Sequence, residues 1–192
     1  IRSIAVSGAN RLPGVVGVIT AADIQDLDAH MPTRSSIDDV ELTPPRHPVL
    51  ASDKVCYVGQ AVAVLIAEDP YTAADALDQI VVDYEILPAL TDPYEALEPD
   101  AMIIHPDQGS NVSLRTLNGG GDLDGAFAQA EHVVRQTYQV QRLAPAPMEP
   151  RGLIADYDSQ ADLLTVWDST QHPHEVREHL VHLLGRTEEG IR

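Results

Sequence analysis

The chain has 192 residues, of which 44% are hydrophobic and 22% are charged, and its 30 acidic and 12 basic side chains give a formal net charge of −18. These proportions are those of a folded protein of one or two domains, and they exclude a disordered or low-complexity chain. The negative charge excludes nucleic acid and an acidic membrane surface as partners, because both are bound through basic side chains.

The first third of the chain predicts short strands and one long loop. Alternating apolar and polar residues predict a strand over 2–7, and the apolar residues that follow the turn at 12–14 predict a second strand over 15–20. A short helix is expected over 21–28. The stretch 31–48 contains four prolines and no hydrophobic period, which predicts an excursion loop.

A strand–helix–strand pattern follows. Strands are expected over 55–57 and 61–67, and the second is apolar at nearly every position, which predicts burial on both faces. Asp69 and Pro70 are a favourable helix start, because a carboxylate can accept backbone N–H bonds and proline suits the first helical position. With a further strand expected over 81–87, the pattern is typical of a βαβ unit in a small α/β or α+β domain.

The pattern dissolves between about 92 and 122, where prolines and glycines accumulate. We therefore divide the chain into a first domain over 1–100, a linker over 101–121 and the beginning of a second domain over 122–192. The elements expected in this last part are a helix over 122–130, strands over 131–142, 152–157 and 163–167, and a helix that Pro173 opens and Gly185 ends.

The single cysteine and the short apolar runs limit the possible redox compartment and membrane association. Cys56 allows no intramolecular disulfide and no cysteine-based zinc site, which fits a reducing compartment, and we expect a small buried side chain there. The longest apolar run, 61–67, is too short to span a bilayer. The chain opens at Ile1 inside an expected strand, so we expect a part of a longer protein.

Two clusters have a functional and a simpler interpretation. The glycines at 119–121 precede a helix and could cradle a phosphate, but a flexible turn with an Asp122 cap is favoured, because the spacing matches no phosphate-binding motif. Four histidines lie within eleven residues: His172, His174, His179 and His182. A metal site is one interpretation of this cluster, and a solvated helix face is the favoured one.

The segment 167–173 has the most promising position for a site. It joins the end of a strand to a helix, the junction where many α/β proteins bind ligands. In the alternative interpretation, Ser169 or Thr170 merely caps the helix. Glu149 and Arg151 lie where an earlier strand begins, and the sequence leaves open whether they form an ion pair or belong to a site.

The order of these motifs resembles the large subunits of molybdenum hydroxylases, the family of xanthine dehydrogenase, aldehyde oxidase and carbon monoxide dehydrogenase. The segments similar to the hammerhead α/β domain of that family are 12–18, 22–24, 58–64 and 82–88, together with Asp69, Ala73 and Ala74. Segment 121–127 resembles the bridge into the first molybdopterin-binding domain, and 148–152 and 169–174 resemble motifs of that domain. The resemblance covers nearly the whole chain.

The resemblance implies an α/β (α+β) fold, with a hammerhead domain followed by the first strands and helix of a molybdopterin-binding domain. It implies one cofactor-binding residue, Gln171, because the matching glutamine of the family approaches the molybdenum centre and hydrogen-bonds an oxo ligand. A neutral amide can do this without adding charge. The catalytic base and the main cofactor loops of the family would lie beyond Arg192, so no catalytic residue and no metal ligand is assigned to this chain.

The implied function is that of the molybdopterin-binding large subunit of an oxidoreductase that hydroxylates aldehydes or N-heterocycles or oxidises carbon monoxide. The implied cofactor is molybdopterin in its cytosine dinucleotide form, and the implied partners are an iron–sulfur small subunit and an FAD-binding medium subunit. The chain alone is expected to be inactive, free of cofactor, self-associating and cytoplasmic. The alternative is a non-catalytic scaffold that contacts neighbouring subunits.

Overall fold

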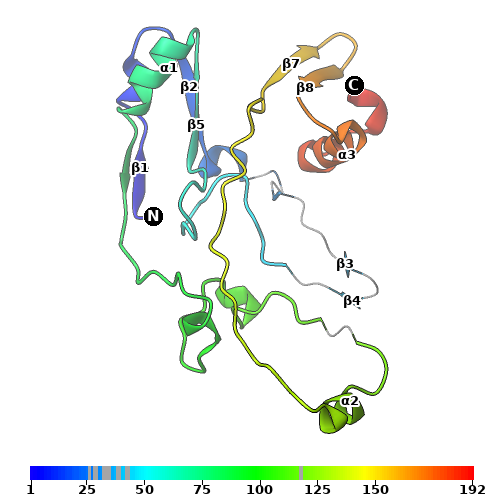
Figure 1. The fold of residues 1–192 in the computed structure, drawn as a ribbon. Helices are drawn as coiled ribbons and strands as arrows, with labels where there is room; N and C mark the ends of the chain where they lie inside the picture. Colours follow the sequence, from blue (N-terminus) through cyan, green and yellow to red (C-terminus); the bar gives the residue numbers. More distant parts are fainter. Residues whose placement is uncertain (26, 28–29, 32–35, 38–39, 42–43, 117–118) are drawn as a thin grey trace.

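The computed structural model describes residues 1–25, 27, 30–31, 36–37, 40–41, 44–116 and 119–192 (Figure 1). Its strands are β1 Ser3–Ala5, β2 Val15–Thr20, β3 Ser36–Ile37, β4 Val40–Glu41, β5 Ala63–Ala67, β6 Val81–Asp83, β7 Leu153–Asp158 and β8 Leu163–Asp168. Its α-helices are α1 Pro70–Leu77, α2 Leu123–Gln129 and α3 Pro173–Leu184. Short 3-10 helices are η1 Ala9–Arg11, η2 Ala21–Ile24, η3 Glu95–Leu97, η4 Pro106–Gln108 and η5 Glu188–Gly190.

Within the described residues the strands pair two by two, and every pair is antiparallel. The pairs are β1 with β6, β2 with β5, β3 with β4 and β7 with β8. Helix α1 packs against β5 and β2, and these elements lie close together in Figure 1. Mixed helices and small sheets of this kind are an α+β arrangement, as the sequence predicts.

Helix α1 begins where the sequence predicts. The Asp69 side chain accepts hydrogen bonds from the backbone N–H groups of Tyr71 and Thr72 at 2.8 and 3.0 Å, and Pro70 occupies the first turn. These bonds satisfy amide groups that have no partner inside the helix. Ala76 on this helix is fully buried, because a methyl side chain allows α1 to lie close to the strands beside it.

The interior of the N-terminal part is made of small and aliphatic side chains. The buried residues there are Ala9, Leu50, Ala51 and Ala76. Leu50 and Ala51 come from the segment that follows β4, and the Ala51 N–H donates to the Ala61 carbonyl at 2.8 Å. The chain has only one Phe and one Trp, and no aromatic side chain is buried among the described residues.

Two predictions near residue 60 are wrong. Residues 55–57 form no strand but part of a turn, in which the half-buried Cys56 donates its backbone N–H to Gln60 Oε1 at 2.7 Å. Strand β5 is not buried on both faces, since Val64 and Ile66 are exposed. The reason is that successive side chains of a strand point to opposite faces, and helix α1 packs on one face of the β2–β5 pair.

The predicted βαβ unit is also corrected. Strand β5, helix α1 and strand β6 follow one another, but β5 pairs with β2 and β6 pairs with β1. The earlier strands therefore supply the hydrogen-bonding partners, and no parallel pair forms among the described strands. Strand β6 ends at Asp83, four residues before the predicted end at 87.

The segment 21–48 is only partly described. The short helix predicted over 21–28 is the 3-10 helix η2, which covers only 21–24. It begins with a capping box in which the Thr20 N–H and hydroxyl both donate to Asp23. Residues 26, 28 and 29 lie outside the described part. Of the predicted loop 31–48, residues 36–37 and 40–41 instead pair as β3 and β4, and most of the others lie outside the described residues.

In the second half, α2, β7, β8 and α3 confirm the predicted order. Gly185 ends α3 in the left-handed conformation, with φ +60°, as predicted. The strand predicted over 131–142 is wrong: this stretch is exposed and without regular structure, and Figure 1 shows it running from α2 towards β7. No strand of the described residues pairs with it, so its apolar side chains, such as Val134 and Tyr138, remain exposed.

No helix among the described residues is both long and apolar enough to cross a membrane.

Candidate functional site

The candidate site is the turn that leaves β8 and enters α3. The β7–β8 hairpin pairs Leu153 with Asp168 and Ile154 with Trp167, so the start of β7 and the end of β8 lie side by side. Residues 169–172 follow as a short turn, and Pro173 opens α3. The position of this junction is as the sequence predicts.

Arg151 forms a forked ion pair with the last residue of β8. Its Nη2 lies 2.7 Å from Asp168 Oδ2 and its Nε lies 3.3 Å from Asp168 Oδ1. The Asp168 side chain is only 6% exposed, whereas that of Arg151 is 64% exposed. The hydrogen bond from Arg151 and the attraction of its charge lower the pKa of Asp168, while partial burial opposes this shift.

Glu149 binds the next residue along. The Ser169 hydroxyl donates to Glu149 Oε1 at 3.1 Å, and the Ser169 backbone N–H donates to the Gly152 carbonyl at 3.1 Å. The sequence leaves open whether Glu149 and Arg151 pair with each other. Among the described contacts, each binds a different residue at the end of β8.

The other end of the turn is held by the start of α3. The His172 backbone N–H donates to Thr170 Oγ1 at 3.1 Å, and the His172 carbonyl accepts the N–H of Val176 at 3.0 Å. His172 is the residue before the first helical turn, and its side chain makes no cap bond. Ser169 and Thr170 therefore do not cap the helix, contrary to the alternative interpretation.

Gln171 lies exposed between these two anchored ends. Its side-chain amide makes no hydrogen bond to any of the described residues, in contrast to Asp168 and Ser169 beside it. A primary amide offers two N–H donors and one carbonyl acceptor without net charge. Gln171 is thus free to bind a polar atom of another group.

A groove of about 770 Å³ lies beside the turn, between β8, α3 and the last residues of the chain. Its apolar lining is Leu163, Val166, Trp167, Val176, Leu180 and Ile191. Ile191 bridges to Leu164 of β8 in parallel orientation, and the Val166 N–H donates to the Arg192 carbonyl at 2.7 Å. Asp168 and Thr170 reach one end of the groove, but Gln171 does not line it.

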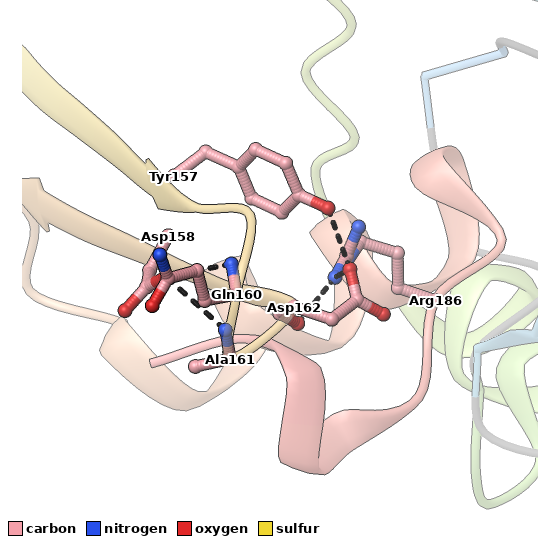
Figure 2. A network of polar contacts seen from close by, with 6 residues as sticks. All are labelled: Tyr157, Asp158, Gln160, Ala161, Asp162 and Arg186. Atoms are coloured by element: carbon pink, nitrogen blue, oxygen red, sulfur yellow. Dashed lines mark hydrogen bonds and ion pairs between the residues drawn. The ribbon is translucent and has the colours of Figure 1, made fainter.

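The opposite end of the hairpin carries a second polar network, which the sequence does not reveal. Figure 2 shows Arg186, just past α3, reaching Asp162 at the β7–β8 turn. Arg186 Nη2 donates to the Asp162 carbonyl and to Asp162 Oδ1, both at 2.6 Å, and the Tyr157 hydroxyl donates to Asp162 Oδ1 at 2.7 Å. These bonds lower the pKa of Asp162, the bond from Tyr157 most. The hairpin and α3 are therefore tied together far from Gln171.

The glycine run before α2 and the histidine cluster of α3 show no ligand-binding arrangement among the described residues. Asp122 caps α2 by accepting the Gly125 N–H at 2.9 Å, as favoured over phosphate binding. His179 and His182 are exposed on α3. No three His, Cys, Asp or Glu side chains in the described part of the chain are grouped so as to hold a metal ion.

Two family models match nearly all of the chain. Residues 1–88 match the a/b hammerhead domain of aldehyde oxidase and xanthine dehydrogenase, and residues 104–192 match the molybdopterin cofactor-binding domain. The chain belongs to the molybdenum hydroxylase large-subunit family. The fold class, a hammerhead α/β domain followed by part of a molybdopterin-binding domain, is therefore as the sequence predicts.

Curated relatives of this family match almost the whole length of this chain. The chain is 38% identical to 6-hydroxypseudooxynicotine dehydrogenase complex subunit gamma of Paenarthrobacter nicotinovorans, over 99% of the chain and 24% of that relative. It is 37% identical to the carbon monoxide dehydrogenase large chain of Afipia carboxidovorans, over 96% of the chain and 25% of that relative. The chain thus spans about a quarter of the length of these family members.

Solved structures of the family share the fold. Quinoline 2-oxidoreductase from Pseudomonas putida 86 superposes with a TM-score of 0.87 at 33% identity, and Cu,Mo-CO dehydrogenase with a TM-score of 0.84 at 35% identity. Each comparison covers the whole of this chain, and 24% and 25% of the respective solved chain.

The residues at the turn suit the cofactor that this family binds. Gln171 is exposed, uncharged and free of hydrogen bonds to the described residues, so it can donate to an anionic or oxygen-rich group. The acidic side chains nearest the turn, Asp168 and Glu149, are both engaged by hydrogen bonds. An uncharged donor at this position is compatible with the cofactor named by the family model of residues 104–192.

Proposed function

We propose that this chain is part of the molybdopterin-binding large subunit of an oxidoreductase, and that Gln171 contacts the molybdenum cofactor. One observation carries the proposal: an exposed primary amide, with no partner among the described residues, lies in a turn that is held at both ends. The family match of residues 104–192 supports it. When bound, the cofactor would supply the oxidation of a substrate carbon.

The proposed task of Gln171 is to donate a hydrogen bond to an oxygen of that cofactor. An amide keeps one charge state across the working pH range, so its contact would not change with the protonation of neighbouring groups. A carboxylate or a cation in its place would alter the charge around the metal. Asp168 is held as a carboxylate by Arg151, so it has no proton to donate at this turn.

The finer properties of the whole protein follow as part of the same proposal. We propose the cytosine dinucleotide form of the cofactor, an iron–sulfur and an FAD-binding subunit as electron-accepting partners, and the cytoplasm as the location. Aldehydes, N-heterocycles or carbon monoxide are the proposed substrates. Two relatives support the last two classes, since one is named nicotine 6-hydroxylase large subunit and the other carbon monoxide dehydrogenase large chain.

The proposed domain boundaries are 1–100 for the hammerhead domain, 101–121 for the linker and 122–192 for the cofactor-binding part. They rest on the composition of the linker and on α2, which opens the last segment with its Asp122 cap.

A scaffold that contacts other subunits is the second candidate. It is favoured by β7, whose residues are all exposed, including the apolar Leu153 and Ile154. An exposed apolar face of this kind is typical of a surface that another chain or domain covers. In this case the chain would support assembly, and Gln171 would have no part in turnover.

The test uses the complete parent subunit in its assembled complex. Gln171→Ala should lower kcat by about 10- to 100-fold, the usual range when a group next to a metal ligand is removed. Molybdenum content, measured by elemental analysis, should stay unchanged. The matched control is Gln160→Ala, which removes an exposed glutamine at the opposite end of the same hairpin and should leave kcat unchanged.

Equal turnover in Gln171→Ala and Gln160→Ala would overturn the proposed contact. Loss of partner subunits in response to substitutions on β7, with normal turnover in Gln171→Ala, would instead establish the scaffold role.

A further inference from the structure

We propose that Arg151 and Glu149 are positioning residues that fix the start of the turn carrying Gln171. The Gln171 amide makes no hydrogen bond to the described residues, so no polar contact fixes it and its placement follows the backbone of 168–172. Whatever holds this backbone also sets where the Gln171 amide can point.

The first contact is the fork between Arg151 and Asp168. Two parallel N–H···O bonds fix both the distance and the plane of the carboxylate, which a single bond cannot do. The Asp168 side chain is only 6% exposed while Arg151 is in place, so the fork leaves little of the carboxylate open to water. Asp168 is therefore restrained more firmly than an exposed ion pair would restrain it.

The second and third contacts act on Ser169. The Ser169 hydroxyl donates a hydrogen bond to the Glu149 carboxylate, and the Ser169 backbone N–H donates one to the Gly152 carbonyl. Glu149 and Arg151 flank Pro150, whose ring limits the backbone between them. One four-residue segment, 149–152, thus binds two successive residues at the end of β8 through three separate groups.

The far end of the turn is held without these residues. The His172 carbonyl belongs to the first turn of α3, and Pro173 limits the backbone that follows. Only Thr170 and Gln171 lie between the two anchored ends. If Ser169 is released, the turn has one fixed end in place of two, and the Gln171 amide samples a wider range of positions.

The direct test is made on this 192-residue chain. Arg151→Lys retains the positive charge and loses the fork, so amide hydrogen exchange at Ser169 should speed up by about tenfold, the effect expected from losing roughly one hydrogen bond. The pKa of Asp168, followed by carbon-detected NMR, should rise towards its ordinary value. Glu149→Gln retains an acceptor for the Ser169 hydroxyl and should behave as the natural chain does, whereas Glu149→Leu should also speed up the exchange.

Arg186→Lys is the matched control, because Arg186 also binds an aspartate of the hairpin by its Nη2 group, at the opposite end. It should affect the hairpin tip and leave the exchange of Ser169 unchanged. Exchange at Ser169 that is unchanged in Arg151→Lys, or equally fast in Arg186→Lys, would overturn the positioning role. A merely general loss of stability would give the second result.

The link to Gln171 rests on the proposed function and needs a separate measurement. In the complete complex, Arg151→Lys should lower kcat with little change in KM, and the double variant with Gln171→Ala should be no slower than Gln171→Ala alone. If the double variant instead lost kcat by the product of the two single losses, Arg151 would not act through Gln171, and this link would be overturned. If Gln171→Ala leaves turnover unchanged while Arg151→Lys still releases Ser169, the proposed function fails and the positioning of the turn stands.

Discussion

Arg151 and Asp168 are 17 positions apart in the sequence, yet two hydrogen bonds of 2.7 and 3.3 Å join the guanidinium of one to the carboxylate of the other. The antiparallel pairing of β7 and β8 brings them together, because Leu153 lies opposite Asp168 and Arg151 is two residues before it. This pair ties a strand start to a strand end exactly where the chain turns towards Gln171.

The pair predicts how the hairpin responds to acid. Because the pKa of Asp168 is lowered in the folded chain, its stabilising effect is complete above the ordinary value of the unfolded chain and is lost as the pH falls through the lowered value. Asp162 contributes in the same direction. The fluorescence of Trp167, the only tryptophan, should therefore report a hairpin that is constant above about pH 5 and loosens below about pH 4.

Asp168→Asn should reduce this acid response, and adding Asp162→Asn should reduce it further. An acid transition of unchanged midpoint and size in the double variant would show that other carboxylates govern it.

Gly185 should be difficult to replace for conformational reasons alone. Its φ is +60°, and a Cβ added there would meet no atom within 4 Å. Gly185→Ala should therefore cost about 1–2 kcal/mol in the free energy of unfolding, the cost of a left-handed conformation for a residue with a Cβ. Urea denaturation measures this value. Gly120→Ala is the control, since Gly120 is equally open and needs no positive φ; equal effects of the two substitutions would contradict the explanation.

Ile191 should carry much of the stability of the C-terminal part. Its side chain is 2% exposed and its residue bridges to β8, although it is the second to last of the chain. Ile191→Ala should lower the free energy of unfolding by about 2–4 kcal/mol, because it leaves a cavity beside β8 and α3. Ile154→Ala, which shortens an exposed isoleucine of the same hairpin, should change it by less than about 0.5 kcal/mol. Similar losses in both variants would refute the packing role.

The 192-residue chain should self-associate. Ile154 and Trp167 are cross-strand partners, and they are 67% and 54% exposed, so they form an apolar patch on the hairpin. Sedimentation velocity at micromolar concentration should detect dimers or larger species, and Ile154→Ser with Trp167→Ser should shift the population towards monomer. A natural chain that stays monomeric at all concentrations would contradict this expectation.

The positions of several elements could be predicted because their signals are local. Asp69 and Pro70 start α1, Gly185 ends α3, and the strand predicted over 15–20, after the turn at 12–14, has the same bounds as β2. Each signal acts within a few residues of its own position: Asp69 through hydrogen bonds that cap the helix, Pro70 through its ring, and Gly185 through its left-handed backbone conformation. The turn around Gln171 was predicted in the same way, from a strand end followed by Pro173.

Other predictions failed because a strand needs a partner. Residues 131–142 have strand-like composition, but no described strand lies beside them, so their backbone stays irregular. Residues 61–67 are apolar throughout, yet β5 has one neighbouring strand and keeps Val64 and Ile66 exposed. Hydrophobic composition indicates a strand, but pairing decides whether the strand forms, and the packing of other elements decides which faces are covered.

The sequence alone determined the negative charge, the single cysteine and the helix caps. It also determined the order of the motifs, which indicates the family of this chain. The tertiary structure alone decided that Arg151 binds Asp168, that Glu149 binds Ser169, and that the amide of Gln171 stays without a partner among the described residues. The physical reason is distance along the chain: these contacts join residues 17 and 20 positions apart. Such contacts depend on the register of β7 and β8, which no local pattern of residues specifies.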